Sequence, residues 1–376
     1  MKKIRLGVIG TGMAWERLHW PALQELSDKY EVVALCNLNR ERALDLARKL
    51  NLPEDKVYDD YNEMFEKEKL DAVDLLVPIP ENYDIAAAVV KANINLIAEK
   101  PLAATMEGAE KLLELHRKHP VLMMVAENYR YDEGVNKVRE LLQQGKIGDV
   151  AYFVLNRSVD FEEEMKKDTF AAREWRQHPE YAGGTFLDAA IHDLAALRHI
   201  FGAVKQVYAM GSPQKEDFSP YRVINTQIEF QNGVIGHFSY YSDGKETQKP
   251  LIGLRVFGNK GELYLEEMNS GVIHLSYPDG STEKVEYQTG RGYYNELLNF
   301  YNAMVGQEEI SVTPEIEYGD LKMVFDILKS IKTNQPVAVA TEKAFKEVGE
   351  PVKIELVINN IIRKKYRFIL RYFFIN

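Results

Sequence analysis

The N-terminal sequence reads Ile4-Arg5-Leu6-Gly7-Val8-Ile9-Gly10-Thr11-Gly12-Met13-Ala14-Trp15. Its apolar run predicts a buried strand, and the pattern after the glycines predicts a helix. In a dinucleotide-binding fold, Gly10 permits the tight turn, Gly12 lets a pyrophosphate approach the backbone, and the helix N-terminus supplies amide donors. Trp15 stands where such folds usually carry a small residue, so either the helix sits differently or the motif is a coincidence. Four residues of this turn are expected to contact the cofactor: Gly10, Gly12, Met13 and Ala14.

The second predicted strand, at 31–36, is followed by Asn37, where dinucleotide-binding folds usually carry an Asp or Glu that binds the adenosine ribose. An amide can bond to the 2′-hydroxyl and does not repel a 2′-phosphate, with which Arg40 or Arg42 could pair. Both arginines could equally be solvated residues of a helix at 41–50. Because no serine-arginine pair follows the strand directly, we expect NAD or NADP with a slight preference for NAD.

Three more apolar segments, at 72–77, 95–98 and 120–125, alternate with predicted helices such as 83–92. Strands that alternate with helices at this spacing form a parallel sheet with right-handed crossovers, and ligands bind beyond the carboxyl ends of its strands. A Rossmann domain over residues 1–127 is therefore predicted. Four residues at these strand ends are also expected to contact the cofactor: Pro78, Asn82, Glu99 and Lys100.

Composition limits the function classes. The chain has 376 residues, more than one hydrophobic core usually supports, so two domains are expected. A net charge of -10, from 47 basic and 57 acidic residues, argues against binding of a nucleic-acid backbone. The single cysteine, Cys36, excludes an internal disulfide and a cysteine-built metal cluster, and no metal site is expected. Because no long apolar segment follows Met1, we expect a cytoplasmic protein that does not bind membranes.

The second half of the chain predicts a large sheet. Strand patterns recur at 150–157, 204–210, 222–230, 234–241, 251–257, 262–266, 272–277 and 283–287. Turn sequences between them, such as Asn232-Gly233, predict a meander-like antiparallel arrangement, with helices near 293–305 and 318–333. The predicted fold class is an α/β Rossmann domain followed by an α+β domain at 128–358, whose sheet is large, open and mostly antiparallel.

An open sheet of this size has one face that its few helices cannot cover, so we expect a homodimer or homotetramer. The C-terminal extension, 359–376, is basic and aromatic. It could be a helix that covers a sheet edge, a subunit contact or a weak membrane-surface segment. We favour packing over membrane binding.

Lys100 ends the apolar stretch Leu96-Ile97-Ala98-Glu99-Lys100-Pro101-Leu102, and a lysine in such a place is often simply solvated. A functional role needs partners from elsewhere in the chain. A glycine pair precedes a predicted helix at 185–201, on which Asp188 and His192 are four residues apart and so share a face. The alternative is a local Asp-His pair that supports the core.

Five motifs occur in order: G-x-I-G-T-G at 7–12, H-W-P-A-L at 19–23, A-E-K-P-L at 98–102, E-N-Y-R-Y at 127–131 and A-G-G-T-F-L-D-A-A-I-H-D at 182–193. Together they resemble the Gfo/Idh/MocA oxidoreductase family, the relatives of glucose-fructose oxidoreductase and inositol dehydrogenase. The resemblance implies hydride transfer between a nicotinamide cofactor and a hydroxyl or carbonyl carbon of a sugar, inositol or sugar-derived polyol. It also implies an active-site trio of Lys100, Asp188 and His192.

In such a site His192 is expected to act as the base, because histidine is the side chain that exchanges protons near neutrality. Lys100 would stabilise the oxyanion, although the two roles could be exchanged, since the lysine handles the proton in some relatives. Asp188 would either orient His192 or bond to a second substrate hydroxyl. Five residues are expected to line the substrate cleft: Tyr129, Arg130, Trp175, Arg176 and Tyr181. The alternative function is a non-catalytic protein of the same fold that senses a dinucleotide or another metabolite.

Overall fold

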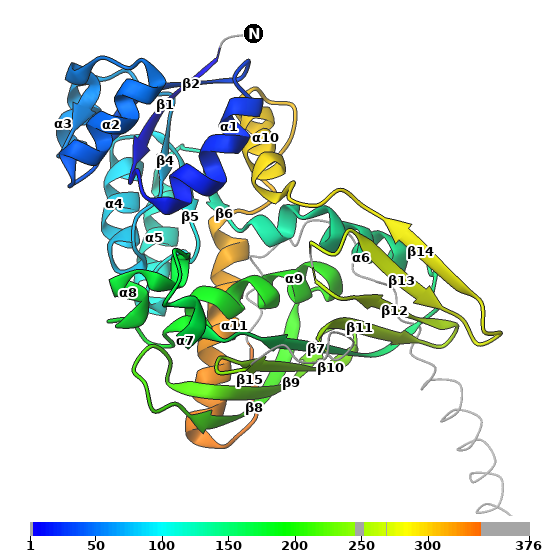
Figure 1. The fold of residues 1–376 in the computed structure, drawn as a ribbon. Helices are drawn as coiled ribbons and strands as arrows, with labels where there is room; N and C mark the ends of the chain where they lie inside the picture. Colours follow the sequence, from blue (N-terminus) through cyan, green and yellow to red (C-terminus); the bar gives the residue numbers. More distant parts are fainter. Residues whose placement is uncertain (1–2, 245–251, 268, 340–376) are drawn as a thin grey trace, which may run out of the picture.

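The computed structural model describes residues 3–244, 252–267 and 269–339, which contain two sheets with helices packed against them (Figure 1). The end of the second predicted domain, 340–358, and the predicted extension 359–376 lie outside the described residues. None of the helices in the described ranges has the length and apolar character needed to cross a membrane.

The N-terminal sheet is fully parallel, with strand order β3-β2-β1-β4-β5-β6. Its strands are β1 Ile4–Ile9, β2 Tyr30–Cys36, β3 Val57–Tyr58, β4 Ala72–Leu75, β5 Asn95–Glu99 and β6 Met123–Ala126. Helices α4 and α5 lie on one side of the sheet, and α1 and α10 on the other (Figure 1). Both faces are thus covered, which is why the strands are nearly continuous apolar runs.

The helices around this sheet are α1 Trp20–Glu25, α2 Arg40–Leu50, α3 Tyr61–Lys67, α4 Ile79–Lys91, α5 Met106–Lys118 and, from the far end of the chain, α10 Gly292–Met304. The helix predicted at 83–92 begins four residues earlier, because α4 starts at Ile79 with a proline in its first turn. Proline is tolerated there since the first helical N–H groups have no intrahelical partner. The two-residue strand β3 was too short to predict.

The turn after β1 also differs from an ordinary dinucleotide-binding helix. It begins with a π-helical turn, Trp15–His19, before α1. Trp15 is fully buried and stacks on Trp20, with 5.6 Å between ring centroids. The helix therefore does sit differently, and the wider turn holds a large side chain where a small residue is usual.

The second sheet has nine strands in the order β14-β13-β12-β11-β7-β10-β9-β8-β15. Their bounds are β7 Val150–Ser158, β8 Val204–Pro213, β9 Tyr221–Phe230, β10 Ile235–Tyr241, β11 Gly253–Gly258, β12 Gly261–Leu265, β13 Val272–Ser276, β14 Thr282–Glu286 and β15 Val337–Ala338. The sheet is mostly antiparallel, as predicted. The expected simple meander is wrong, because β7 lies between β10 and β11 and runs parallel to β10.

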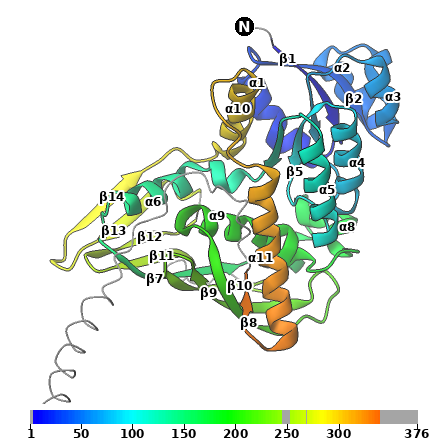
Figure 2. The same cartoon turned by 180° about the vertical axis from the view of Figure 1, so that it is seen from behind.

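Helices cover the inner face of this sheet. They are α6 Glu133–Gln143, α9 Ile191–Phe201 and α11 Pro314–Thr333, and the short helices α7 Phe161–Glu164 and α8 Glu174–Gln177 lie between β7 and α9 in sequence. Phe153 of β7, Phe201 of α9 and Phe230 of β9 form an aromatic cluster in this core. Helix α11 packs on β8 and also on α5 of the first domain, so it links the two sheets (Figure 2).

The outer face of the nine-stranded sheet carries exposed apolar side chains. Of the six large hydrophobic residues that are exposed in the described ranges, four belong to its strands: Tyr152, Met210, Ile235 and Tyr241. Alternate residues of β10, such as Phe238, are buried on the other face. Exposed apolar side chains gathered on one face of a sheet favour association.

We propose that this outer face is buried against a second copy of the chain. Light scattering at micromolar concentration should then give a mass of two or four chains, and Ile235→Glu should lower it by placing charge in the interface. Val305→Glu is the matched control, since Val305 is also an exposed apolar residue but lies after α10. A wild-type monomer would contradict the proposal.

Candidate active site

A cavity of about 430 Å³ lies where the carboxyl ends of the parallel strands meet the start of α9. We call it the catalytic cavity. It brings together all three residues of the predicted trio, Lys100, Asp188 and His192. Other predicted residues that line it are Gly12, Met13, Ala14, Pro78, Glu99, Trp175 and Arg176.

Asp188 is placed by the glycine pair before it. Gly183 and Gly184 both have positive φ values, 94° and 50°. A Cβ on Gly184 would lie 2.2 Å from the backbone oxygen of Phe218, so no other residue fits this close approach. The chain then enters a π-helical turn, Phe186–Ala190, which continues directly into α9.

Lys100 and Asp188 form an ion pair across the two domains. Lys100 Nζ lies 2.9 Å from Asp188 Oδ1 and donates a second hydrogen bond to the backbone oxygen of Asp188 at 2.6 Å. Arg176 Nε binds the other carboxylate oxygen at 2.5 Å. Burial alone would raise the pKa of Asp188, but the Arg176 and Lys100 cations outweigh it and hold this pKa well below its ordinary value. Asp188 therefore remains a carboxylate that fixes the lysine.

His192 has a different carboxylate partner. Its Nδ1 lies 2.7 Å from Oε1 of Glu127, which is fully buried. The contacts of the Asp188 carboxylate are with Lys100 and Arg176, so the expectation that Asp188 orients His192 is not what the geometry shows. Glu127 takes that place. The sequence contained a signal for it, because Glu127 follows β6 at the same sheet edge at which Lys100 follows β5.

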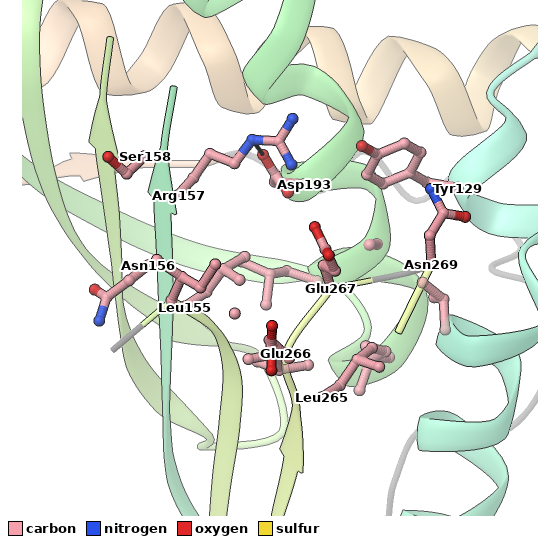
Figure 3. A pocket seen from close by; sticks show the side chains of 17 residues that line it. Tyr129, Leu155, Asn156, Arg157, Ser158, Asp193, Leu265, Glu266, Glu267 and Asn269 are labelled. Atoms are coloured by element: carbon pink, nitrogen blue, oxygen red, sulfur yellow. Dashed lines mark ion pairs between the residues drawn. The ribbon is translucent and has the colours of Figure 1, made fainter. Parts of the chain in front are cut away.

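Tyr129 stacks on His192, with 4.6 Å between ring centroids and 19° between ring planes. It lines a second cavity, of about 270 Å³, which also contains Arg157 and Asp193 (Figure 3). Arg157 Nε lies 3.9 Å from Asp193 Oδ2 in that cavity, and Arg157 lines the catalytic cavity as well. Tyr129 thus packs against one face of the His192 ring and supports it.

The other predicted cleft residues divide into two groups. The Arg176 guanidinium lies over the Trp175 ring at 4.2 Å, and both line the catalytic cavity. Tyr181 is buried beside Trp175 and does not line that cavity. Arg130 also lies elsewhere, because its Nη2 is paired with Asp320 of α11 at 2.7 Å. The prediction that Arg130 contacts the substrate is not supported: its guanidinium links the start of the second domain to α11.

A third cavity, of about 560 Å³, adjoins the glycine turn, and we call it the adenosine cavity. It is lined by Gly10 and Asn37 among the predicted residues, and it shares Gly12 and Pro78 with the catalytic cavity. Arg40 does not line it. The two cavities therefore adjoin at Gly12 and Pro78, between the end of β2 and Lys100.

The glycine turn fits a pyrophosphate in this space. Gly10 has φ of 91°, and a Cβ there would lie 2.1 Å from the backbone oxygen of Leu76, so the turn requires glycine. A Cβ on Gly12 would meet no atom within 4 Å, which leaves open space beside the helix N-terminus. Asn37 Nδ2 donates to Thr11 Oγ1 at 2.7 Å and so ties the turn to the end of β2.

Asn82, which was predicted to contact the cofactor, instead supports the backbone around Lys100. Its side-chain amide donates to the backbone oxygens of Glu99 and Pro101, both at 2.8 Å. It lines neither the catalytic nor the adenosine cavity. Asn82 therefore holds the backbone on both sides of Lys100.

Comparisons with known proteins agree with this geometry. The model of the Gfo/Idh/MocA oxidoreductase family, NAD-binding Rossmann fold, matches residues 4–127, and the model of its C-terminal α/β domain matches residues 139–339. The chain belongs to the Gfo/Idh/MocA family. As a member it is an NAD(P)-dependent oxidoreductase, and the family and fold class predicted from the sequence are confirmed.

Several relatives match nearly the whole chain. The Saccharomyces cerevisiae protein YMR315W is 31% identical over 347 residues, covering 89% of this chain and 97% of its own. The myo-inositol 2-dehydrogenase of Thermotoga maritima is 24% identical, with 96% of each chain covered. An oxidoreductase structure from Thermotoga maritima has a TM-score of 0.80 at 26% identity and covers 90% of this chain and 99% of its own. Levoglucosan dehydrogenase in complex with NADH and L-sorbose shares the fold, with a TM-score of 0.79 at 19% identity over 91% and 100% of the two chains.

The ion pair between Lys100 and Asp188 can be tested by mutation. Because Asp188 contacts Lys100, Asp188→Asn should lower kcat as Lys100→Ala does, by about 100- to 1,000-fold, the cost of losing one oxyanion donor. The double variant should be little worse than either single variant, since both remove one interaction. Steady-state kinetics and calorimetry with the dinucleotide measure both effects, and dinucleotide affinity should survive.

The matched control is Asp168→Asn, which removes an exposed carboxylate of the same segment and should leave kcat unchanged. Additive losses in the double variant would show that Lys100 and Asp188 act separately.

Proposed function

We propose that the protein transfers a hydride between a nicotinamide cofactor and a hydroxyl or carbonyl carbon of a sugar, inositol or sugar-derived polyol. The observation that carries the proposal is the catalytic cavity, in which Lys100 and His192 face the same space as the glycine turn. The inositol and levoglucosan dehydrogenases named above support the substrate class, since the chain is similar to both over most of its length.

The residues of the cavity divide the chemistry between them. Glu127 accepts a hydrogen bond from Nδ1 of His192, which leaves Nε2 of a neutral ring as the proton acceptor. Lys100 donates to the substrate oxygen and stabilises the negative charge that develops on it. Asp188 and Arg176 hold the lysine in place, and Tyr129 holds the histidine ring. The bound nicotinamide supplies the hydride acceptor or donor.

Substrate turnover is tested by following nicotinamide absorbance with a panel of inositols, aldoses and sugar-derived polyols. At least one member should be oxidised, and His192→Ala should slow that reaction and flatten the near-neutral part of its pH profile, because the base is gone. An unchanged rate and profile for His192→Ala would leave Lys100 as the proton acceptor. Cofactor binding without turnover of any panel member would contradict the proposed substrate class.

We infer further that NAD is the preferred cofactor. Asp59 and Asp60 follow β3 and line the adenosine cavity together with Asn37. A 2′-phosphate in this cavity would approach two carboxylates, which repel it. Of the two arginines considered for this phosphate, Arg40 does not line the adenosine cavity. Arg42 pairs with Glu16 at 3.2 Å and lines the catalytic cavity instead.

Calorimetry should therefore give a Kd for NAD at least about tenfold below that for NADP, a difference expected from one nearby charge repulsion. Asp59→Asn should narrow the gap by improving NADP binding. Asp45→Asn, an exposed carboxylate of α2 outside the cavity, should leave the gap unchanged. A tenfold preference for NADP in the wild type would overturn the inference.

A further inference from the structure

A buried histidine lies behind the catalytic cavity and takes no part in the chemistry described so far. His19, at the end of the π-helical turn, is fully buried. Its Nδ1 lies 3.0 Å from Oδ2 of Asp74 in β4, which is also fully buried, and its Nε2 lies 3.2 Å from Oε1 of Glu99 in β5. One imidazole thus bridges carboxylates from two neighbouring strands of the parallel sheet.

This geometry decides the charge of the ring. A carboxylate only accepts hydrogen bonds, so a ring with a carboxylate at each nitrogen must carry a hydrogen on both and is an imidazolium. Burial alone would lower the pKa of His19, but Asp74 and Glu99 outweigh it and raise this pKa well above its ordinary value. In return, His19 holds the pKa of Glu99 below its ordinary value although burial acts to raise it.

Helix α10 closes the other side of this cluster. Glu296 Oε1 lies 3.8 Å from Nε2 of His19, and neither carboxyl oxygen of Glu296 has a hydrogen-bond partner among the described residues. Burial raises the pKa of Glu296 well above its ordinary value, which favours the neutral acid at a site where its oxygens find no donor among the described residues. Tyr293, 5.9 Å from the imidazole between ring centroids, is a neutral phenol. The cluster therefore contains one cation and two carboxylates.

Only one of these acidic groups reaches the cavity. Glu99 lines the catalytic cavity beside Lys100 and opposite the residues of the glycine turn, whereas Asp74, His19 and Glu296 do not line it. The backbone of Glu99 is held by Asn82 and its side chain by His19. Contacts within the protein therefore fix both the position and the charge of Glu99.

We propose that His19 is a positioning residue: as a buried imidazolium it fixes Glu99 as an ionised carboxylate at the nicotinamide end of the cavity, where Glu99 favours the oxidised, positively charged ring over the reduced, neutral one. The proposal rests on the cofactor placement of the proposed function. A fixed negative charge in a partly dry cavity attracts a cationic ring and gains nothing comparable from a neutral ring. His19 thus acts on cofactor binding through Glu99.

The experiment is calorimetry of NAD⁺ and of NADH with the purified protein, read as the ratio of the two Kd values. Glu99→Gln keeps the side-chain shape and removes the charge, so the affinity for NAD⁺ should fall by roughly tenfold while that for NADH stays the same. His19→Gln should change the ratio in the same direction. If His19 acts through Glu99, the double variant should match Glu99→Gln alone.

Glu296→Gln is the matched control. It replaces a neutral acid by a neutral amide at the same distance from His19, so the ratio should not change. If His19→Gln fails to fold, Asp74→Asn serves instead, because it removes the carboxylate that holds the imidazolium and should shift the ratio as His19→Gln would. Melting curves identify the folded variants.

These measurements need no substrate, so a failed search for sugar turnover would leave them intact. An unchanged ratio in Glu99→Gln would overturn the role of Glu99. A changed ratio in Glu99→Gln with an unchanged ratio in folded His19→Gln or Asp74→Asn would overturn the role of His19.

Discussion

The active site depends on one ion pair that crosses between the domains. Lys100 directly follows the fifth strand of the parallel sheet, and Asp188 lies in the π-helical turn that leads into α9 of the second domain. Both side chains are largely buried, and removing one partner of a buried pair typically costs about 3–5 kcal/mol because a charge is left unpaired. The relative position of the two domains is therefore tied to the position of Lys100.

The second domain also contributes through Arg176 and through the start of α9. Arg176 donates to the Asp188 carboxylate, and its guanidinium carbon lies 4.2 Å from the Trp175 ring centroid and 5.5 Å from that of Phe170. These aromatic contacts help to hold the guanidinium in place. This chain of contacts passes from the short helices between β7 and α9 to Lys100, so these short elements position the lysine.

Buried acids around the site are neutralised in two ways. Asp320 of α11 is paired with Arg130 and with Arg198, and it connects the start of the second domain to the helix that spans both sheets. Glu296 has no hydrogen-bond partner among the described residues, and burial raises its pKa well above its ordinary value although His19 lies 3.8 Å away, which favours the neutral acid. Arg130 shows why a substrate contact could not be predicted from the motif alone: an arginine next to an active-site motif can instead form a buried ion pair that stabilises the fold.

The sequence by itself determined the local elements. The apolar run of β1, the glycine turn after it and the alternation of strands and helices predicted a parallel sheet, and the spacing of Asp188 and His192 placed both on one helix face. Each of these signals depends on residues within a few positions of one another, where backbone geometry alone decides which side chains can meet.

Only the tertiary structure decided the pairings. Glu127 is 65 residues from His192, and His19 is 55 residues from Asp74, so no periodicity connects them. The insertion of β7 beside β10 likewise depends on how the chain returns after α9. Such contacts are selected by packing and by the need of every buried charge for a partner, and those conditions exist only once the two domains are in place.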